Sequence, residues 1–156
     1  MIWFRRDLSP QIQRLATQRP VLVLTGTRQA GKTSLLRRFF PDHRFVSLDL
    51  PADAALADED PATFLARNPP PLLVDEVQNA PGLFAYLKAD VDAHREQNGR
   101  YILTGSQGFA LMEGVSNSLA GRVAVLELEP LGWGELSALP DLTVEQLLVR
   151  GGYPEL

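Results

Sequence analysis

The sequence predicts an α/β fold in which a parallel β-sheet carries helices on both faces. Short apolar segments alternate along the chain with amphipathic segments of helical spacing, and this alternation is typical of repeated strand–helix–strand units. The 156 residues, 45% hydrophobic and 22% charged, are enough for one domain with its own core. We therefore expect a folded domain and exclude a disordered, collagen-like or coiled-coil chain.

The individual elements follow from caps and periodicity. A leading helix is expected first, with Ser9 as its N-cap, Pro10 as its first residue and Pro20 beyond its end. The expected strands are residues 21–25, 45–48, 72–75, 101–104 and 123–128. The expected helices between them are residues 31–40, 61–66 and 83–97. Proline-containing stretches at 51–53 and 69–71 are interpreted as stiff loops.

The order of the strands is predicted from which of them are apolar throughout. A central strand of a parallel sheet is buried on both faces and reads as an unbroken apolar run. Residues 21–24, 72–74 and 101–103 are such runs, whereas 45–48 contains a serine and 123–129 ends in polar alternation. We place the latter two strands at the edges, which is compatible with the order 5-1-4-3-2.

Composition excludes several kinds of site. The chain has no cysteine, so disulfides, thiolate-bound zinc and iron–sulfur clusters are excluded. Its two histidines, His43 and His94, lie too far apart in sequence to indicate a local metal site, and we expect any metal to be a hard ion held by oxygen. No apolar run resembles a signal peptide or the ~18 residues of a membrane span, so we expect a cytoplasmic protein with no membrane partner.

Positive charge is concentrated near the N-terminus. The first 44 residues carry nine Lys and Arg against two Asp, although the whole chain has a net charge of −4. Such an excess is found either on solvated helix faces or near an anionic ligand. The motif that lies in this part of the chain favours the anionic ligand.

Residues 26–33, GTRQAGKT, match the phosphate-binding pattern G-x-x-x-x-G-K-[ST] and lie between a predicted strand and a predicted helix. Backbone N–H groups of such a loop point at phosphate oxygens. Lys32 is expected at the β- and γ-phosphates and Thr33 at Mg²⁺; the alternative is a glycine-rich turn with a surface lysine. The predicted nucleotide-binding residues are Gly26, Thr27, Arg28, Gln29, Ala30, Gly31, Lys32, Thr33 and Ser34.

Two acidic residues end the third predicted strand. Asp75 and Glu76 follow the apolar run at 72–74, at the edge where ligands of open α/β sheets bind. Asp75 is expected to complete the Mg²⁺ site with Thr33, usually through water, and Glu76 to act as the general base toward water. The alternative is that both residues cap a helix.

Three more polar residues are candidates for the site. Ser106 follows the fourth strand and is expected to contact the γ-phosphate or the attacking water as a sensor, with Thr104 as a second candidate; the alternative is that such residues simply end strands. Arg122 precedes the last strand and is either an arginine finger toward a neighbouring copy or a surface ion-pair residue. The two histidines are expected to be structural.

Together these residues resemble the AAA-type P-loop ATPase domain found in many bacterial and archaeal proteins ahead of a C-terminal domain of unknown function. The resembling stretches are GTRQAGKTSLL (26–36), FVSLDLP (45–51), DPATFL (60–65), LLVDEVQNAPGLFAYLK (72–88), YILTGSQ (101–107), SLAGRVAVLELEPL (118–131) and GGYPE (151–155). The resemblance implies a P-loop NTPase three-layer sandwich. It also implies the roles given above for Lys32, Thr33, Asp75, Glu76, Ser106 and Arg122.

The resemblance divides the chain into three parts. Residues 1–19 are expected to form a helical lead-in, 20–130 the ATPase core and 131–156 a C-terminal helical segment. Chains of this family typically continue into a second domain, whereas this sequence ends at Leu156, so we expect that domain to be absent.

The leading functional hypothesis is an ATP-binding domain that hydrolyses ATP with Mg²⁺, with a homo-oligomer as one expected assembly. A P-loop small-molecule kinase is an alternative, disfavoured by Glu76 beside Asp75 and by the lack of an arginine-rich lid segment. A GTPase is disfavoured because N-K-x-D does not occur. The remaining alternative is a non-hydrolysing, nucleotide-dependent switch or nucleic-acid-binding module.

Overall fold

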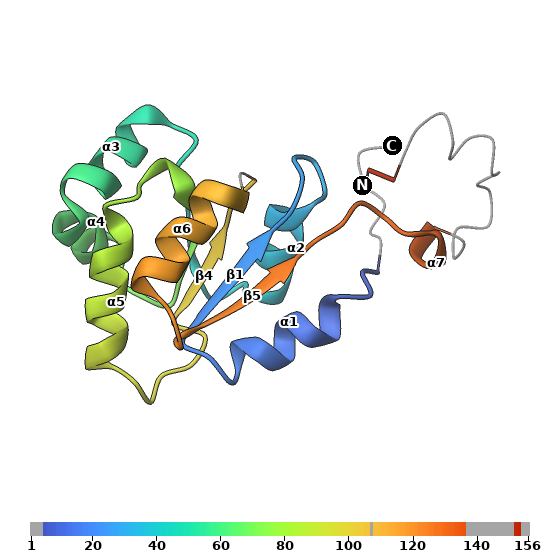
Figure 1. Cartoon of the computed structure of the whole chain (residues 1–156), viewed down its shortest axis with the longest axis horizontal. Coiled ribbons are helices and arrows are strands. Elements are labelled where there is room, and N and C mark those ends of the chain that lie inside the picture. The colour runs from blue at the N-terminus through green and yellow to red at the C-terminus, as the bar shows by residue number, and fades with distance from the viewer. Residues whose placement is uncertain (1–4, 107, 137–151, 154–156) are drawn as a thin grey trace.

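Five parallel strands form the centre of the structure (Figure 1). The computed structural model describes residues 5–106, 108–136 and 152–153. The strands are β1 (Val21–Thr25), β2 (Arg44–Ser47), β3 (Leu72–Asp75), β4 (Tyr101–Thr104) and β5 (Val123–Glu127). Their order is β2-β3-β4-β1-β5, which confirms the predicted order 5-1-4-3-2 read from the other edge.

Burial agrees with these positions. Every residue of β1, β3 and β4 is buried, whereas β2 and β5 expose part of their length. The unbroken apolar runs therefore marked the inner strands and the interrupted ones marked the edges.

Helices cover both faces of the sheet and complete three layers. One face packs α3 (Pro51–Glu59), α4 (Pro61–Arg67), α5 (Leu83–Ala93) and α6 (Gly108–Ser118) around a core that includes Phe64, Phe84 and Leu111. The other face packs α1 (Ser9–Ala16) and α2 (Lys32–Phe39) around Ile12 and Leu36. Figure 1 shows these groups on opposite sides of β1 and β5. A short helix, α7 (Trp133–Leu136), follows β5.

Several element predictions were wrong in detail. The stretch at 51–53 is not a loop but begins α3, since Pro51 lies in the first turn, where a missing N–H costs nothing. Helix α6 was not predicted, because its two glycines lower the helix propensity of a segment whose buried apolar residues include Leu111 and Val115. Helix α5 ends at Ala93 rather than 97: His94 departs from helical geometry, and its Nδ1 donates to the Asp90 carbonyl.

The ends of the chain also differ from expectation. Helix α1 includes Ser9 itself, and its N-cap is Leu8. The predicted helical segment 131–156 lies mostly outside the described residues; within it, α7 is described and the Leu131 N–H donates to the Gly152 carbonyl. No described helix is both long and apolar enough to cross a membrane.

Phe64 offers a test of the core on the α4 face. Its side chain is 1% exposed, so replacing it with alanine removes a buried ring and should lower the free energy of unfolding by about 3–5 kcal/mol. Urea denaturation measures the change. The control is Leu50→Ala at a position 63% exposed, expected to change stability by no more than about 0.5 kcal/mol. Equal effects of the two substitutions would contradict this packing.

Candidate functional site

The phosphate-loop motif forms the turn between β1 and α2. Gly26 has φ +136°, and a Cβ at this residue would lie 2.2 Å from the Leu128 carbonyl oxygen, so a side chain is excluded there. Gly31 caps α2 with φ 88°, in the left-handed region that glycine adopts at little cost. The two motif glycines are therefore required by the backbone path of the loop.

The other loop residues differ in exposure. Thr27, Arg28, Gln29 and Ser34 are exposed, whereas Ala30 is completely buried beneath the loop. Gln29 adopts a positive φ of 63°, an uncommon conformation for a residue with a side chain. The exposed members leave the outer side of the loop accessible to a ligand.

Lys32 folds its side chain back across its own loop. The residue is 5% exposed, and its Nζ donates to the carbonyls of Gly26 and Thr27 at 2.8 and 2.7 Å. Burial lowers the pKa of Lys32 below its ordinary value, and the nearby carboxylates of Glu76 and Asp75 offset part of that decrease. The loop thus holds a buried cation beside two acidic side chains.

Asp75 joins three segments at the carboxyl edge of the sheet. The Thr33 hydroxyl, from α2, donates to Asp75 Oδ1 at 2.8 Å. The Thr104 hydroxyl, at the end of β4, donates to the same oxygen and accepts the Glu76 N–H at 3.2 Å. Thr104, the second candidate in the sequence, is therefore the residue that fixes the acidic pair, and Asp75 is only 7% exposed.

The donor set at this edge fits Mg²⁺. Thr33 and Asp75 supply a hydroxyl and a carboxylate oxygen side by side, and Mg²⁺ prefers one or two such ligands completed by waters and substrate phosphates. No group of three or more His, Cys, Asp or Glu suited to a metal occurs among the described residues. The site therefore fits an ion that is held jointly with a phosphate-bearing ligand.

Glu76 is held in an unusual conformation. Its backbone is left-handed, with φ 54° and ψ 46°, which costs a non-glycine residue of order 1 kcal/mol or more. Its Oε2 accepts the Ser106 hydroxyl at 2.7 Å, the Ser106 N–H at 3.3 Å and a hydrogen bond from Gln78. Burial raises the pKa of Glu76, but the hydrogen bonds from Gln78 and Ser106, with the charge of Lys32, outweigh it and lower the pKa below its usual value. Glu76 is thus ionised at neutral pH.

Gln78 was missed as a site residue. Its Nε2 donates to Glu76, and its buried Oε1 has no hydrogen-bond partner among the described residues. A Cβ at Gly105 would lie 2.6 Å from that oxygen, so the glycine between Thr104 and Ser106 makes room for the amide. The available signal was the stretch LLVDEVQ, which carries part of the family resemblance, but no role was assigned to its glutamine.

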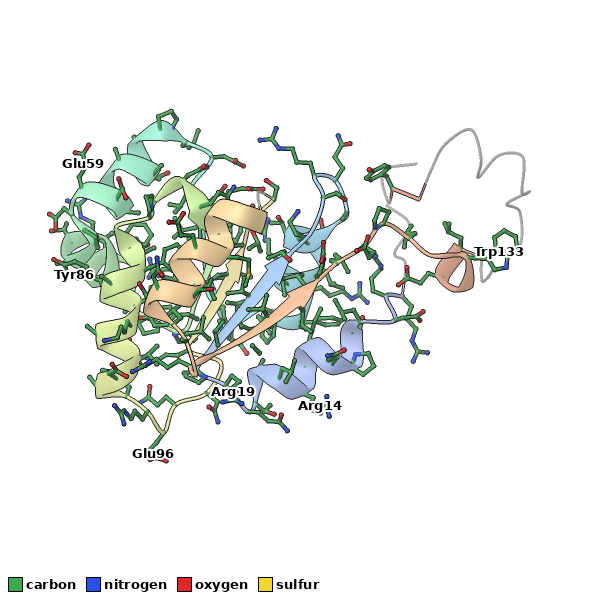
Figure 2. The ribbon with its side chains drawn as sticks, in the orientation of Figure 1. Arg14, Arg19, Glu59, Tyr86, Glu96 and Trp133 are labelled. Atoms are coloured by element: carbon green, nitrogen blue, oxygen red, sulfur yellow. The ribbon has the colours of Figure 1, made fainter. Side chains whose placement is uncertain are left out.

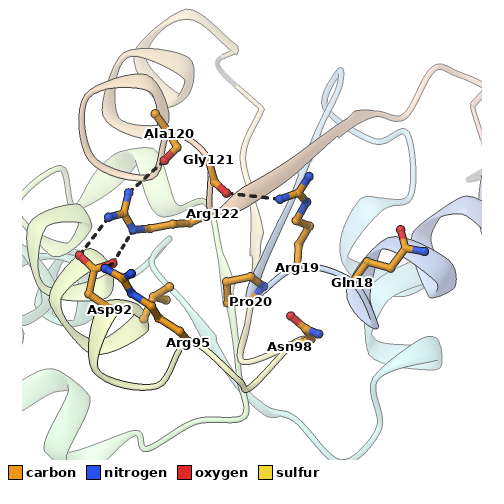
Figure 3. A pocket seen from close by; sticks show the side chains of 10 residues that line it. Gln18, Arg19, Pro20, Asp92, Arg95, Asn98, Ala120, Gly121 and Arg122 are labelled. Atoms are coloured by element: carbon orange, nitrogen blue, oxygen red, sulfur yellow. Dashed lines mark hydrogen bonds and ion pairs between the residues drawn. The ribbon is translucent and has the colours of Figure 1, made fainter.

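Arg122 is not brought to the other site residues. It lies just before β5, at the amino edge of the sheet, and β5 spans about 16 Å between that edge and the phosphate loop. Figure 3 shows its guanidinium pairing with Asp92, where Nε and Nη2 donate at 2.6 and 3.1 Å, while Nη1 donates to the Ala120 carbonyl. Arg122 is an ion-paired residue in the single chain, in line with one of its two predicted roles. The other role, an arginine finger toward a neighbouring copy, stays a prediction, because Arg122 cannot reach the loop of its own chain.

Arg122 helps to line an open cavity of about 400 Å³. Arg19 and Arg95 also line it, and Arg19 Nη1 donates to the Gly121 carbonyl at 3.3 Å (Figure 3). Asp92 offsets part of this positive charge, because it contacts both Arg122 and Arg95. The cavity lies at the sheet edge opposite the phosphate loop, so it forms no part of the loop's site.

The histidines are distant from the phosphate loop. His43 Nε2 donates to the Gly99 carbonyl at 2.7 Å, and His94 Nδ1 donates to the Asp90 carbonyl at 2.8 Å. Both rings therefore hold backbone turns, as expected of structural residues.

Fold and site together define a class. A parallel sheet of order 2-3-4-1-5, a strand–GTRQAGKT–helix turn and an acidic strand end beside the motif threonine are the features of a Walker-type P-loop domain. A family model described as an AAA domain matches residues 18–137, most of the chain. The chain belongs to the AAA domain family.

Curated relatives are similar over nearly the whole chain. Two uncharacterized proteins, from Mycobacterium bovis and Mycobacterium tuberculosis, are each 34% identical over 157 aligned residues, covering 99% of this chain. The chain spans about a third of their length, 34% in each case.

Solved structures share the fold at low identity. The Walker-type ATPase PABY2304 of Pyrococcus abyssi superposes with a TM-score of 0.64 at 16% identity, covering 97% of this chain and 65% of that one. The Thermotoga maritima RuvB Holliday junction branch migration motor gives a TM-score of 0.56 at 18% identity, covering 86% and 49%. These likenesses show the fold.

The hydrogen bonds to Glu76 predict a pH effect. Replacing Ser106 with alanine should raise the pKa of the Glu76 carboxyl, because the serine donates to the ionised form. A carboxyl with a lowered folded-state pKa stabilises the protein above its unfolded pKa, and this contribution disappears as the pH falls through the folded pKa. The stability deficit of Ser106→Ala should therefore be largest near neutral pH and shrink in acid.

Carboxyl-carbon NMR titration measures the pKa of Glu76, and urea unfolding at several pH values measures the stability. The control is Ser116→Ala, an exposed serine on α6. An unchanged Glu76 pKa in Ser106→Ala would contradict the described hydrogen bond.

Proposed function

We propose that this chain binds Mg²⁺-ATP at the phosphate loop and hydrolyses it. The observation that carries the proposal is the contact between Thr33 of the loop and Asp75 of the acidic strand end, at 2.8 Å. This contact combines a phosphate-binding turn with an oxygen donor pair for Mg²⁺. Membership of the AAA domain family supports a nucleotide as the ligand.

The loop would hold the phosphates. Backbone N–H groups from Gly26 to Ser34, at the N-terminus of α2, provide donors and a positive helix end. The buried ammonium of Lys32 would exchange its two carbonyl partners for phosphate oxygens, which carry full negative charge. Binding would thus give the buried ammonium of Lys32 charged partners in place of neutral carbonyl oxygens.

Thr33 and Asp75 would hold the metal. When bound, Mg²⁺ neutralises charge on the β- and γ-phosphate oxygens. Thr104 keeps Asp75 in place through its hydrogen bond to Oδ1.

Glu76 and Ser106 would act on the attacking water. The ionised carboxylate of Glu76 can accept a proton from water, and Ser106 sets its direction by donating to Oε2. A low pKa makes Glu76 a weak base, which suits a residue that chiefly orients water. Gln78 would assist Ser106 by donating to the same oxygen of the carboxylate.

One observation favours a second candidate function. Oε2 of Glu76 accepts three hydrogen bonds from Ser106 and Gln78, which leaves this oxygen little capacity for water. The second candidate is therefore a switch that binds ATP without turnover and responds through its shape.

Replacing Glu76 with glutamine separates these functions. Hydrolysis should fall by about 10²–10⁴-fold, because the neutral amide orients water less strongly than the carboxylate and cannot accept its proton, while Mg²⁺-ATP binding is retained. Phosphate release and calorimetric binding are the two measurements, with Lys32→Ala expected to lose binding. No turnover in the wild type despite binding would favour the switch, and turnover unaffected by Glu76→Gln would remove Glu76 from the mechanism.

Controls identify the substrate class. GTP competing better than ATP would overturn the choice of adenine nucleotide. Transfer of the phosphoryl group to a metabolite in place of water would indicate a kinase. DNA or RNA binding that weakens with salt would revive the nucleic-acid module.

We further propose that Arg122 serves the nucleotide of a neighbouring copy. Its position at the amino edge prevents it from reaching its own loop, so only an assembly could use it in catalysis. On assembly the Arg122 guanidinium would leave Asp92 and contact the phosphates of the neighbouring nucleotide, so that one anionic partner replaces another. Cavity residues Arg19 and Arg95 would then face the partner.

Mixing two inactive variants tests this arrangement. Arg122→Ala keeps its loop and Lys32→Ala keeps its arginine, so each alone should hydrolyse ATP poorly, whereas the mixture should recover activity at shared interfaces. Phosphate release against protein concentration measures the recovery. Full activity of Arg122→Ala alone, or no recovery when mixed oligomers form, would contradict a role across the interface.

A further inference from the structure

Arg6 lies outside every predicted site, yet it contacts the phosphate loop. Its side chain is 6% exposed, and Nη1 donates to the Ala30 carbonyl at 2.8 Å. Nη2 donates to the Glu129 carbonyl, and Nε pairs with Glu135 Oε1 at 3.0 Å. One guanidinium therefore joins the loop to the segment that follows β5. We call these four residues, Arg6, Ala30, Glu129 and Glu135, the Arg6 clasp.

The charge of Arg6 is balanced at the α7 end. Glu135 Oε1 also accepts the Asp7 N–H at 2.8 Å, and Oε2 accepts the Gly132 N–H at 2.9 Å. Burial raises the pKa of Glu135, but the hydrogen bonds from Asp7, Gly132 and Arg6 lower it below its ordinary value. A buried arginine without such a partner would be strongly destabilising, so loop and α7 depend on each other for this pairing.

The contact with Ala30 also orients the loop. In a planar trans peptide the C=O and N–H point in opposite directions. By holding the Ala30 carbonyl on the buried side, Arg6 directs the Gly31 N–H to the other side of that peptide. That N–H immediately precedes Lys32, where phosphate would bind.

We propose that Arg6 is a positioning residue that couples ligand binding at the phosphate loop to the placement of α7. A ligand that restrains the Ala30–Gly31 peptide also restrains the Ala30 carbonyl, to which Arg6 donates. The restrained Arg6 side chain then restrains Glu129 and Glu135, its other two hydrogen-bond partners. Because coupling is reciprocal, a docked α7 strengthens ligand binding by the same factor. The inference rests on the proposed nucleotide binding and adds a route from that site to the chain beyond β5.

Trp133 provides a reporter at the α7 end. It is the first residue of α7, is 62% exposed, and is shown at the right of Figure 2. The chain has one other tryptophan, Trp3. Every protein in the experiment, the parent included, carries Trp3→Phe, so that Trp133 is the sole indole. Its fluorescence is followed during Mg²⁺-ATP titration, and calorimetry gives the Kd independently.

In the parent protein, Trp133 fluorescence should change over the same ATP concentrations as calorimetric binding. In Arg6→Gln the Kd should rise by about tenfold, within the usual range of coupling between sites, and the Trp133 response should vanish even when ATP saturates the loop. Arg6→Lys keeps the charge but not the three-way fork, so it should also lose the response. The control is Arg14→Gln, the same change on the exposed side of α1, which should behave as the parent.

A second variant cuts the α7 end alone. Glu135→Ala keeps Arg6 and the loop sequence, and it should lose the Trp133 response and weaken ATP binding in a chain that urea unfolding shows to be folded. A normal Kd and a normal response in both Arg6→Gln and Glu135→Ala would overturn the coupling while leaving the proposed function intact. Failure of the folded parent protein to bind Mg²⁺-ATP would overturn the proposed function, and the coupling with it.

Discussion

Two threonine hydroxyls from different parts of the chain donate to the same carboxylate oxygen of Asp75, and the site is organised around this convergence. Thr33 lies on the helix after β1, and Thr104 ends β4. They meet at Asp75 because β4 lies between β1 and β3, with Val74 in register with Leu103. A buried carboxylate is costly without such partners, so strand order and site chemistry constrain each other.

Charge balance follows from the same arrangement. Lys32 is buried within its loop, and its pKa is lowered by desolvation against the opposing effect of Glu76 and Asp75. Glu76 is ionised because Gln78 and Ser106 donate to it. The edge therefore brings together one buried cation, two oxygen donors and a second carboxylate, which are the groups that the proposed function assigns to phosphate, Mg²⁺ and water.

Much of this was predictable from sequence. Unbroken apolar runs gave the inner strands, and the spacing of GTRQAGKT together with the position of Asp75 gave the residues that meet. Contacts that depend on a turn or on distant segments could not be predicted: the left-handed backbone of Glu76, which lets Gln78 reach it, and the burial of Arg6 against Ala30. Helix α6 was not predicted because its glycines have low helix propensity, and α3 was not predicted because its proline was interpreted as a loop residue although proline is favoured in the first turn of a helix.

The central claim is that the carboxyl edge of the sheet is a Mg²⁺-nucleotide site organised by Asp75. Calorimetric titration of ATP, with Mg²⁺ and with the metal chelated, tests it most directly when wild type is compared with Asp75→Asn, whose amide oxygen can still accept from both threonines. Mg²⁺ should tighten ATP binding to the wild type and have little effect on the variant. The same Mg²⁺ dependence in both proteins, or no ATP binding to the folded wild type, would contradict the account.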